Sequence, residues 1–234
     1  MTHHPDGPGG PPGRRRPIPM ALTVAVSVFL AVLVPVYWHL YGWTNFLWYC
    51  DFALLVTTAG LCAQSSLLLS IAAVGILLPQ CFWLADFGCH LAGWHFLDLT
   101  NYMFDPRLSW FIRGLSLFHG WLPLLLVWAL FRVGYDHRAL IVWTILAAGL
   151  LVLDYAFTLP AGAHPANPNT PINVNLIYGF DDGRPQALLN EKLYVPLWFC
   201  GLWLCLWLPT HLVLQKCFNP PRVTPAWKPS RCLF

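Results

Sequence analysis

Charged residues are scarce in this sequence. Asp, Glu, Lys and Arg make up 10% of the 234 residues, whereas hydrophobic residues make up 57%. Soluble domains carry about 25% charged residues, so this scarcity excludes a conventional soluble domain. The sequence also has no Cys-x-x-Cys pair, which is the usual signature of a zinc site or a thiol redox motif. We therefore expect no metal and no cofactor, and the net charge of +3 gives no reason to expect nucleic-acid binding.

Long apolar runs take the place of the missing charges, and six of them are long enough to cross a membrane. A helix needs about 20 predominantly apolar residues to span ~30 Å of hydrocarbon. The predicted spans are 18–38, 45–63, 66–85, 110–131, 139–158 and 194–215. Together they form a single transmembrane domain, residues 18–215, with two long connections at 86–109 and 159–193. We predict an all-α fold, a polytopic transmembrane helix bundle.

Lysine and arginine are distributed unevenly between the two sides of this bundle. If the N-terminus lies inside, nine basic residues lie on the inner side: Arg14, Arg15, Arg16, Arg132, Arg138, Lys216, Arg222, Lys228 and Arg231. Four lie on the outer side: Arg107, Arg113, Arg184 and Lys192. This is the positive-inside pattern. We expect a disordered cytoplasmic tail at 1–17, a second cytoplasmic tail at 216–234, and a protein of the bacterial inner membrane with both long loops outside.

Ionisable and amide side chains within the spans are expected mainly in the outer half of the membrane. They include Asp51, in the stretch FLWYCDFALLVT, and Gln80, Arg113, His119 and Asp154. Charges at such depths are costly, so they should face the bundle interior and pair with one another. We expect Arg113 to pair with Asp51 or Asp154 and the group to line a polar pocket open to the outer face. The structural alternative is an Asp–Arg pair between helices, with His119 bonded to a backbone carbonyl.

The two long loops carry further polar residues. His90 and His95 are five residues apart, which is not the spacing that places two metal ligands on one helix face. A short interfacial or re-entrant helix is expected across CHLAGWHFLDL, followed by a turn at FDPRLSW. In the second loop, INVNLIYGF indicates an extended lid segment with Asn173 and Asn175 on one face, or alternatively an exposed linker.

Three stretches occur in an order that resembles a known family. FLWYCDFALL, GLSLFHGWLPLLLVW and NVNLIYG, with RPQ downstream, are similar to motifs of the YwaF-like integral membrane proteins. Those are small bacterial bundles that resemble a eukaryotic transmembrane acyltransferase acting on phospholipids. The matching positions are Cys50 or Asp51, His119, and Asn175 with Tyr178 and Pro185. The sequence departs from the family at Thr44 and Trp48, where histidines are usual, and at Arg184, which replaces a lysine.

The resemblance implies acyl transfer or hydrolysis on a membrane lipid. His119 would be the general base and Cys50 the nucleophile, with Asp51 orienting the base or Arg113. Substrate contacts are expected from Arg113, Gln80, Asp154, Asn175 and Tyr178. Two other function classes use the same residues: a non-enzymatic binder or transporter of a small molecule or lipid, and a structural membrane protein. Membrane lipids are the expected partners in each case.

Overall fold

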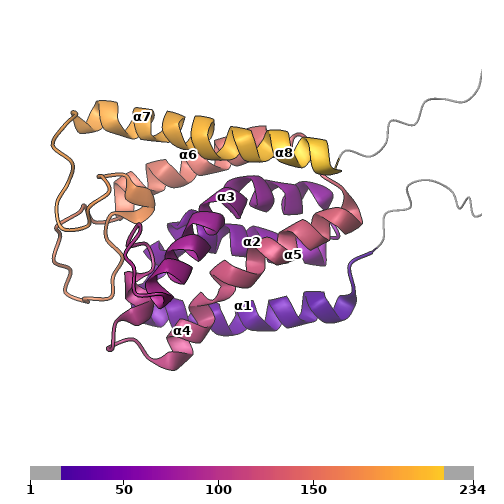
Figure 1. Ribbon diagram of the computed structural model, residues 1–234, viewed down its shortest axis with the longest axis horizontal. Helices are drawn as coiled ribbons and strands as arrows, with labels where there is room; N and C mark the ends of the chain where they lie inside the picture. Colours follow the sequence, from indigo (N-terminus) through magenta and orange to yellow (C-terminus); the bar gives the residue numbers. More distant parts are fainter. Residues whose placement is uncertain (1–16, 219–234) are drawn as a thin grey trace, which may run out of the picture.

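The computed structural model describes residues 17–218, and the predicted tails lie outside the described residues apart from residues 17 and 216–218. The described chain is a bundle of helices (Figure 1). Within residues 17–218 no strand forms, although an isolated bridge pairs Leu159 with Ile172. The prediction of an all-α fold is confirmed.

The helices follow the predicted spans closely. They are α1 (Met20–Tyr41), η1 (Trp43–Leu47), α2 (Tyr49–Cys62), α3 (Ser66–Leu91), η2 (Asn101–Phe104), α4 (Trp110–Ser116), α5 (Phe118–Val133), α6 (Ala139–Phe157), η3 (Val174–Leu176), α7 (Glu191–Leu202), η4 (Trp203–Trp207) and α8 (Leu208–Phe218). Five helical segments are long and apolar enough to cross a membrane: α1, α3, α4 with α5, α6, and α7 to α8. The apolar helix α2 has 14 residues and is shorter than a span by itself.

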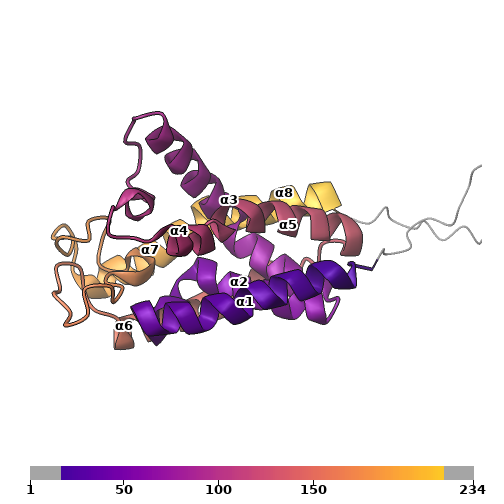
Figure 2. The ribbon, with the colours of Figure 1, turned by 90° about the horizontal axis from the view of Figure 1, so that it is seen from below.

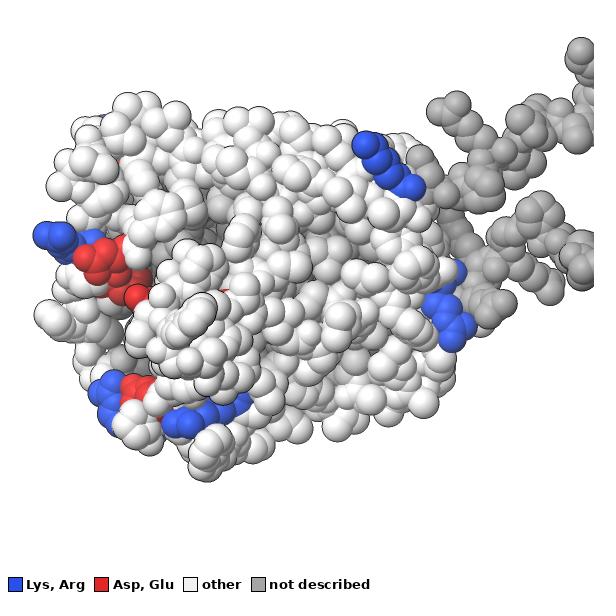
Figure 3. Space-filling view, viewed as in Figure 1, with Lys and Arg blue, Asp and Glu red and all other residues white. Residues whose placement is uncertain are grey.

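The two ends of the bundle differ in what they carry. The described chain begins and ends at the same end, and the long loops lie at the opposite one (Figure 1). We call these the inner and the outer end, following the predicted orientation. On the face shown in Figure 3, charged side chains gather at the two ends and the surface between them is uncharged. An uncharged face over helices long and apolar enough to cross a membrane indicates integration in a membrane.

Helix α3 is the centre of the bundle and packs against α2, α5, α6 and α8. Its closest approach to α6 depends on Gly75. A Cβ atom at Gly75 would lie 2.4 Å from the indole ring of Trp143, which is fully buried. Trp143 in turn meets the ring of Trp207 edge to face, with ring centroids 5.9 Å apart. Glycine is therefore needed here for close packing rather than for backbone freedom.

The boundaries differ from the predicted ones at two places near the outer end. The second predicted span, 45–63, is broken at Trp48, whose extended backbone separates η1 from α2. Helix α3 continues beyond the predicted end at residue 85 to Leu91, and its outer part projects from the body with the loop that follows (Figure 2). The predicted re-entrant helix across CHLAGWHFLDL is wrong, because residues 89–91 end α3 and turns follow. The turn at FDPRLSW is confirmed, with Ser109 capping α4.

The last crossing contains a turn of π-helix, η4, between α7 and α8. Pro209 follows it in the first turn of α8. Proline has no backbone N–H and its ring crowds the carbonyl group four residues earlier, here that of Cys205. The wider π turn lets the helix pass this point without ending.

Candidate functional site

Asp51 lies in the first turn of α2, because the break at Trp48 makes Tyr49 the first helical residue. The sequence predicted a position well inside a continuous helix. Asp51 is buried, with 5% of its surface exposed. The N-terminus of a helix carries a partial positive charge that stabilises a carboxylate in the first turn. The start of α2 therefore offsets part of the cost of placing an acid at this depth.

Arg113 does not pair with either of the acids expected as partners. Its Nη2 donates to the backbone carbonyl of Asp105 at 2.6 Å, and its guanidinium carbon lies 4.6 Å from the ring centroid of Trp110. No ion pair within residues 17–218 includes Asp51 or Asp154. Arg113 is the fourth residue of the short helix α4, and its long side chain reaches back to the turn before the helix. The predicted pairing with Asp51 or Asp154 is wrong.

The turn whose backbone carbonyl binds Arg113 also contains an ion pair between Asp105 and Arg107. Arg107 contacts the carboxylate of Asp105, with Nη2 2.6 Å from Oδ2. Hydrogen bonds from Arg107 lower the pKa of Asp105 to about 2, and the charge of Arg113 contributes in the same direction. Asp105 therefore balances the two arginines at the outer end of α4.

Polar side chains from α1, η2, α3 and α4 meet in the outer half of the bundle. The hydroxyl groups of Tyr37 and Ser116 are 2.8 Å apart. The hydroxyl group of Tyr102 lies near Ser116 and Trp83. Burial raises the pKa of Tyr102 above its ordinary value, and the negative charge of Asp51 adds to this effect. These contacts make the group continuous across four elements.

We call this group the outer polar cluster. It consists of Tyr37, Cys50, Asp51, Gln80, Trp83, Tyr102, Arg113, Ser116 and His119. Five of the predicted site residues are among them. Gln80 is included because it lies three residues before Trp83, on the same side of α3. Counted along α2 and α3 from the contact between Gly60 and Leu69, Asp51 and Gln80 also differ in depth by only about 3 Å. Arg113 shares a helix side with Ser116, three residues later.

His119 is held in one orientation. Its Nδ1 lies 2.8 Å from the carbonyl oxygen of Ser116, and its ring stacks on Trp83 with centroids 5.0 Å apart. A carbonyl oxygen only accepts, so Nδ1 carries the hydrogen and Nε2 keeps a lone pair. No group within residues 17–218 bonds to Nε2. The predicted alternative, a bond from His119 to a backbone carbonyl, is confirmed.

Cys50 lies beside Asp51 rather than beside a base. Its Sγ donates to Asp51 Oδ2 at 3.7 Å, the outer limit for a hydrogen bond that involves sulfur. No hydrogen bond within residues 17–218 joins Cys50 to His119. A nucleophile and its base normally lie within hydrogen-bond reach, although that contact is often looser without substrate. The catalytic roles of Cys50 and His119 therefore remain predictions.

Four polar atoms of the cluster are buried without a hydrogen-bond partner among the described residues. Two are acceptors, Oδ1 of Asp51 and Oε1 of Gln80, and two are donors, Nε1 of Trp83 and Nε of Arg113. Leaving a buried polar atom unsatisfied costs about 1–3 kcal/mol. Such an accumulation at one place calls for a functional explanation.

Asp154 and Asn175 form a second, separate group. The Nδ2 of Asn175 donates to Asp154 Oδ2 at 2.7 Å and to the Leu47 carbonyl at 2.9 Å. Its Oδ1 accepts from the backbone N–H of Tyr49 at 3.0 Å, and its carbonyl accepts from Trp198 Nε1 at 2.8 Å. Asn175 thus caps α2 and joins it to α6 and α7. We call these contacts the Asn175 junction.

The segment around Asn175 is not the predicted extended lid. Asn173 and Asn175 both adopt left-handed backbone conformations, with φ of 51° and 53°, around the short helix η3. The Nδ2 of Asn173 donates to the Gly179 carbonyl at 2.9 Å, while its Oδ1 accepts from the Tyr178 N–H. Tyr178 stacks on Tyr155, and burial raises the pKa of its phenol. The loop is folded against the bundle, and Tyr178 belongs to its packing.

The first outer loop is organised by Asp86, near the end of α3. Its two carboxylate oxygens accept hydrogen bonds from the N–H groups of Leu97, Asp98 and Thr100 and from the Thr100 hydroxyl group, at 2.6–3.1 Å. His95 contacts Asp98, and His90 stacks on Phe104. Within residues 17–218 no group of three or more His, Cys, Asp or Glu side chains is arranged to hold a metal ion.

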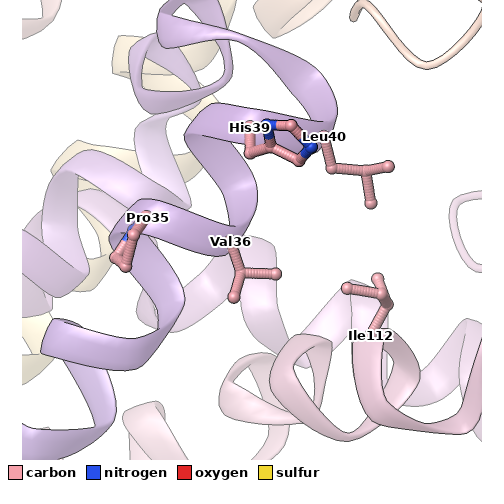
Figure 4. A pocket seen from close by; sticks show the side chains of 5 residues that line it. All are labelled: Pro35, Val36, His39, Leu40 and Ile112. Carbon is pink, nitrogen blue, oxygen red and sulfur yellow. The ribbon is translucent and has the colours of Figure 1, made fainter.

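Two cavities among the described residues lie apart from the outer polar cluster. One, of about 440 Å³, lies between α1 and α4 and is lined by Pro35, Val36, His39, Leu40 and Ile112. In Figure 4 the side chains of Val36, Leu40 and Ile112 point into this space. The other, of about 240 Å³, is formed within the second outer loop, residues 163–172. Neither is lined by a residue of the outer polar cluster.

The cluster residues that the sequence did not single out are Ser116 and three aromatic residues, Tyr37, Trp83 and Tyr102. No motif or spacing in the sequence distinguishes the three aromatic residues from the many others in the chain. Their signal is weak because an aromatic ring with a polar tip is common near membrane interfaces. No protein-family model matches the chain, and no curated protein or solved structure was found that is significantly similar to it.

Proposed function

We propose that this multi-pass membrane protein binds the polar part of a small molecule or lipid in the outer polar cluster. We place it in the bacterial inner membrane, where the ligand enters from the outer side and membrane lipids surround the helices. The observation that carries the proposal is the set of four buried, unpartnered atoms from α2, α3 and α4. Two acceptors and two donors suit a ligand that offers both kinds of hydrogen-bonding group.

The cluster holds four of the eight buried side-chain atoms that lack a hydrogen-bond partner among the described residues; others, such as Asp154 Oδ1 and Trp143 Nε1, lie elsewhere in the bundle. Asp86 is the comparison within the same molecule, because its carboxylate accepts four hydrogen bonds and orders a loop. Asp51 has the thiol of Cys50 as its single hydrogen-bond donor among the described residues. Ionisable residues kept in a membrane despite such poor local compensation are functional candidates. The contrast favours binding over a structural role for the cluster.

The binding proposal is tested by the compounds that co-purify with the protein. We would purify the wild type and a Gln80→Leu/Trp83→Phe double variant in a mild detergent, and identify bound compounds by mass spectrometry. Thr23→Val is the matched control, because Thr23 also has a buried, unpartnered hydroxyl group but lies near the inner end of α1. A compound enriched with the wild type and the control but depleted from the double variant supports the proposal. The same compounds in all three samples contradict it.

A second candidate, acyl transfer or hydrolysis on a lipid, is favoured by His119. The bond from its Nδ1 to the Ser116 carbonyl leaves Nε2 able to accept a proton, as a general base requires. The resemblance to YwaF-like proteins supports the same role, with Cys50 as nucleophile. This reading requires Cys50 or another nucleophile to move within reach of Nε2 when the substrate binds.

The enzymatic candidate is tested by lipid profiles of membranes that contain the protein. Wild type, His119→Ala and the control His39→Ala would be expressed at matched levels, and acyl-chain distributions measured by mass spectrometry. His39 lies on α1 at the apolar cavity, outside the cluster. A change present with the wild type and the control but absent with His119→Ala supports lipid chemistry. Identical profiles from folded proteins contradict it.

A further inference from the structure

We infer that the group bound by the outer polar cluster carries a positive charge on nitrogen, as an alkylammonium does. The inference rests on the proposed binding function and names the ligand chemistry of that same site. Its basis is Asp51, a buried acid that no basic side chain neutralises within residues 17–218.

Asp51 is buried at a position that provides no counterion for its charged form. The first turn of α2 stabilises a carboxylate through the helix dipole, and the N–H of Tyr49 at this end is already bonded to Asn175. Arg113, which the sequence suggests as its counterion, is bonded to the Asp105 carbonyl and lies over Trp110. A buried carboxylate is stable when paired, and a cationic ligand is the partner that this site lacks within the chain.

A second oxygen and several aromatic rings extend the site around Asp51. The Oε1 of Gln80 is buried, has no described partner and lies at nearly the same depth on the adjacent helix α3. Tyr37 and Tyr41, whose rings meet edge to face at 5.2 Å, lie close enough to Asp51 to interact with it electrostatically. Oxygen acceptors together with aromatic rings are the chemistry that recognises substituted ammonium groups.

The ammonium group can come from a lipid headgroup or from a free solute, so the test includes both. The full-length protein, in a neutral detergent, would be titrated with free choline, with lysophosphatidylcholine, and with lysophosphatidylglycerol of the same acyl chain. Isothermal titration calorimetry reports binding, because it needs no reporter residue and can therefore be applied to every variant, including Gln80→Leu/Trp83→Phe. The wild type is compared with Asp51→Asn and with Glu191→Gln, which removes an exposed outer carboxyl group on α7.

We expect the wild type and Glu191→Gln to bind the choline lipid about tenfold more tightly than the glycerol lipid. Asp51→Asn should remove this preference. Binding of free choline that Asp51→Asn abolishes also supports the inference and identifies a soluble source, whereas binding of the choline lipid alone identifies a lipid source.

Three results would overturn the inference. Equal binding of both lipids shows that charge on nitrogen is not recognised, and a preference unchanged by Asp51→Asn shows that Asp51 does not recognise it. In both cases the binding function stands if Gln80→Leu/Trp83→Phe weakens all binding. The third result, no binding of any probe by the folded wild type, contradicts the inference, and the co-purification experiment then decides the binding function separately.

Discussion

Asn175 is the residue whose replacement should most clearly separate structure from function in this protein. Its side chain makes three hydrogen bonds that join residues far apart in the sequence: to the N–H of Tyr49, to the carbonyl of Leu47 and to the carboxylate of Asp154. It holds the second outer loop against the bundle and caps α2 directly before Asp51. It also has a left-handed backbone, with φ of 53°.

The expected loss of stability follows from these contacts. Each buried hydrogen bond contributes about 1 kcal/mol to the free energy of unfolding, so Asn175→Ala should remove about 3 kcal/mol. Alanine in the left-handed region adds about 1 kcal/mol, for a total of about 4 kcal/mol. Asn175→Asp avoids the backbone cost and keeps an acceptor for Tyr49. It loses both donated bonds, however, and places a carboxylate against Asp154, so it should destabilise by a similar amount.

Equilibrium unfolding in mixed detergent and SDS micelles would measure these free energies. Limited proteolysis of residues 159–193 gives a local readout that should change in parallel. Adding Asp154→Asn to Asn175→Asp restores an amide donor opposite a carboxylate, so the double variant should recover part of the loss. The reasoning is refuted if Asn175→Ala costs less than about 1 kcal/mol, or if Asp154→Asn is equally costly in the presence and absence of Asn175→Asp.

Two further predictions concern packing and pH. Gly75→Ala places a methyl group 2.4 Å from the Trp143 ring, so it should lower the free energy of unfolding by about 1–3 kcal/mol, and adding Trp143→Leu should relieve much of this in the same assay. Asp136 bonds to Arg138 at 2.7 Å, which lowers the pKa of Asp136. The pKa of Asp136 is lower in the folded protein than in the unfolded chain. The contact with Arg138 therefore stabilises the fold fully above the ordinary pKa of aspartate, and this stabilisation is lost as pH falls through the lowered pKa. Unfolding measured against pH should show this loss for the wild type but a smaller one for Asp136→Asn, and equal slopes would contradict the prediction.

The positions of the helices could be predicted from the sequence because membrane physics leaves few alternatives. A run of about 20 apolar residues must form a helix whose backbone bonds are internal. The predicted spans at 110–131 and 139–158 therefore agree with helical segments in the structure to within about two residues, and the span at 66–85 lies within α3. The break at Trp48 could not be predicted, because nothing in an apolar residue indicates that its backbone is extended.

The partners of polar residues were harder to predict, because partners depend on folding at long range. Arg113 was predicted to pair with the carboxylate of Asp51 or Asp154, because an isolated charge in a membrane is costly. It lies close enough to the outer end of α4 to reach the backbone of the Asp105 turn instead. Asn175 caps a helix that begins 126 residues earlier, and no local pattern indicates such a contact. The sequence therefore predicts that most of these polar residues lie in the outer half of the membrane. It does not predict that they form two separate groups, the outer polar cluster and the Asn175 junction.

Asp86 and Asp51 differ in how many hydrogen bonds their carboxylates accept, and the consequence of this difference can be measured. Asp86 accepts four hydrogen bonds, so Asp86→Asn should destabilise the protein by disturbing bonds to the first outer loop. Asp51 accepts one weak bond from Cys50 and has an unpartnered oxygen, so Asp51→Asn removes a poorly compensated buried acid. It should leave the free energy of unfolding unchanged or raise it, as happens when a site maintained for function is removed. If Asp51→Asn instead destabilises the protein as much as Asp86→Asn does, Asp51 is a structural residue, and the binding function has to be sought elsewhere in the bundle.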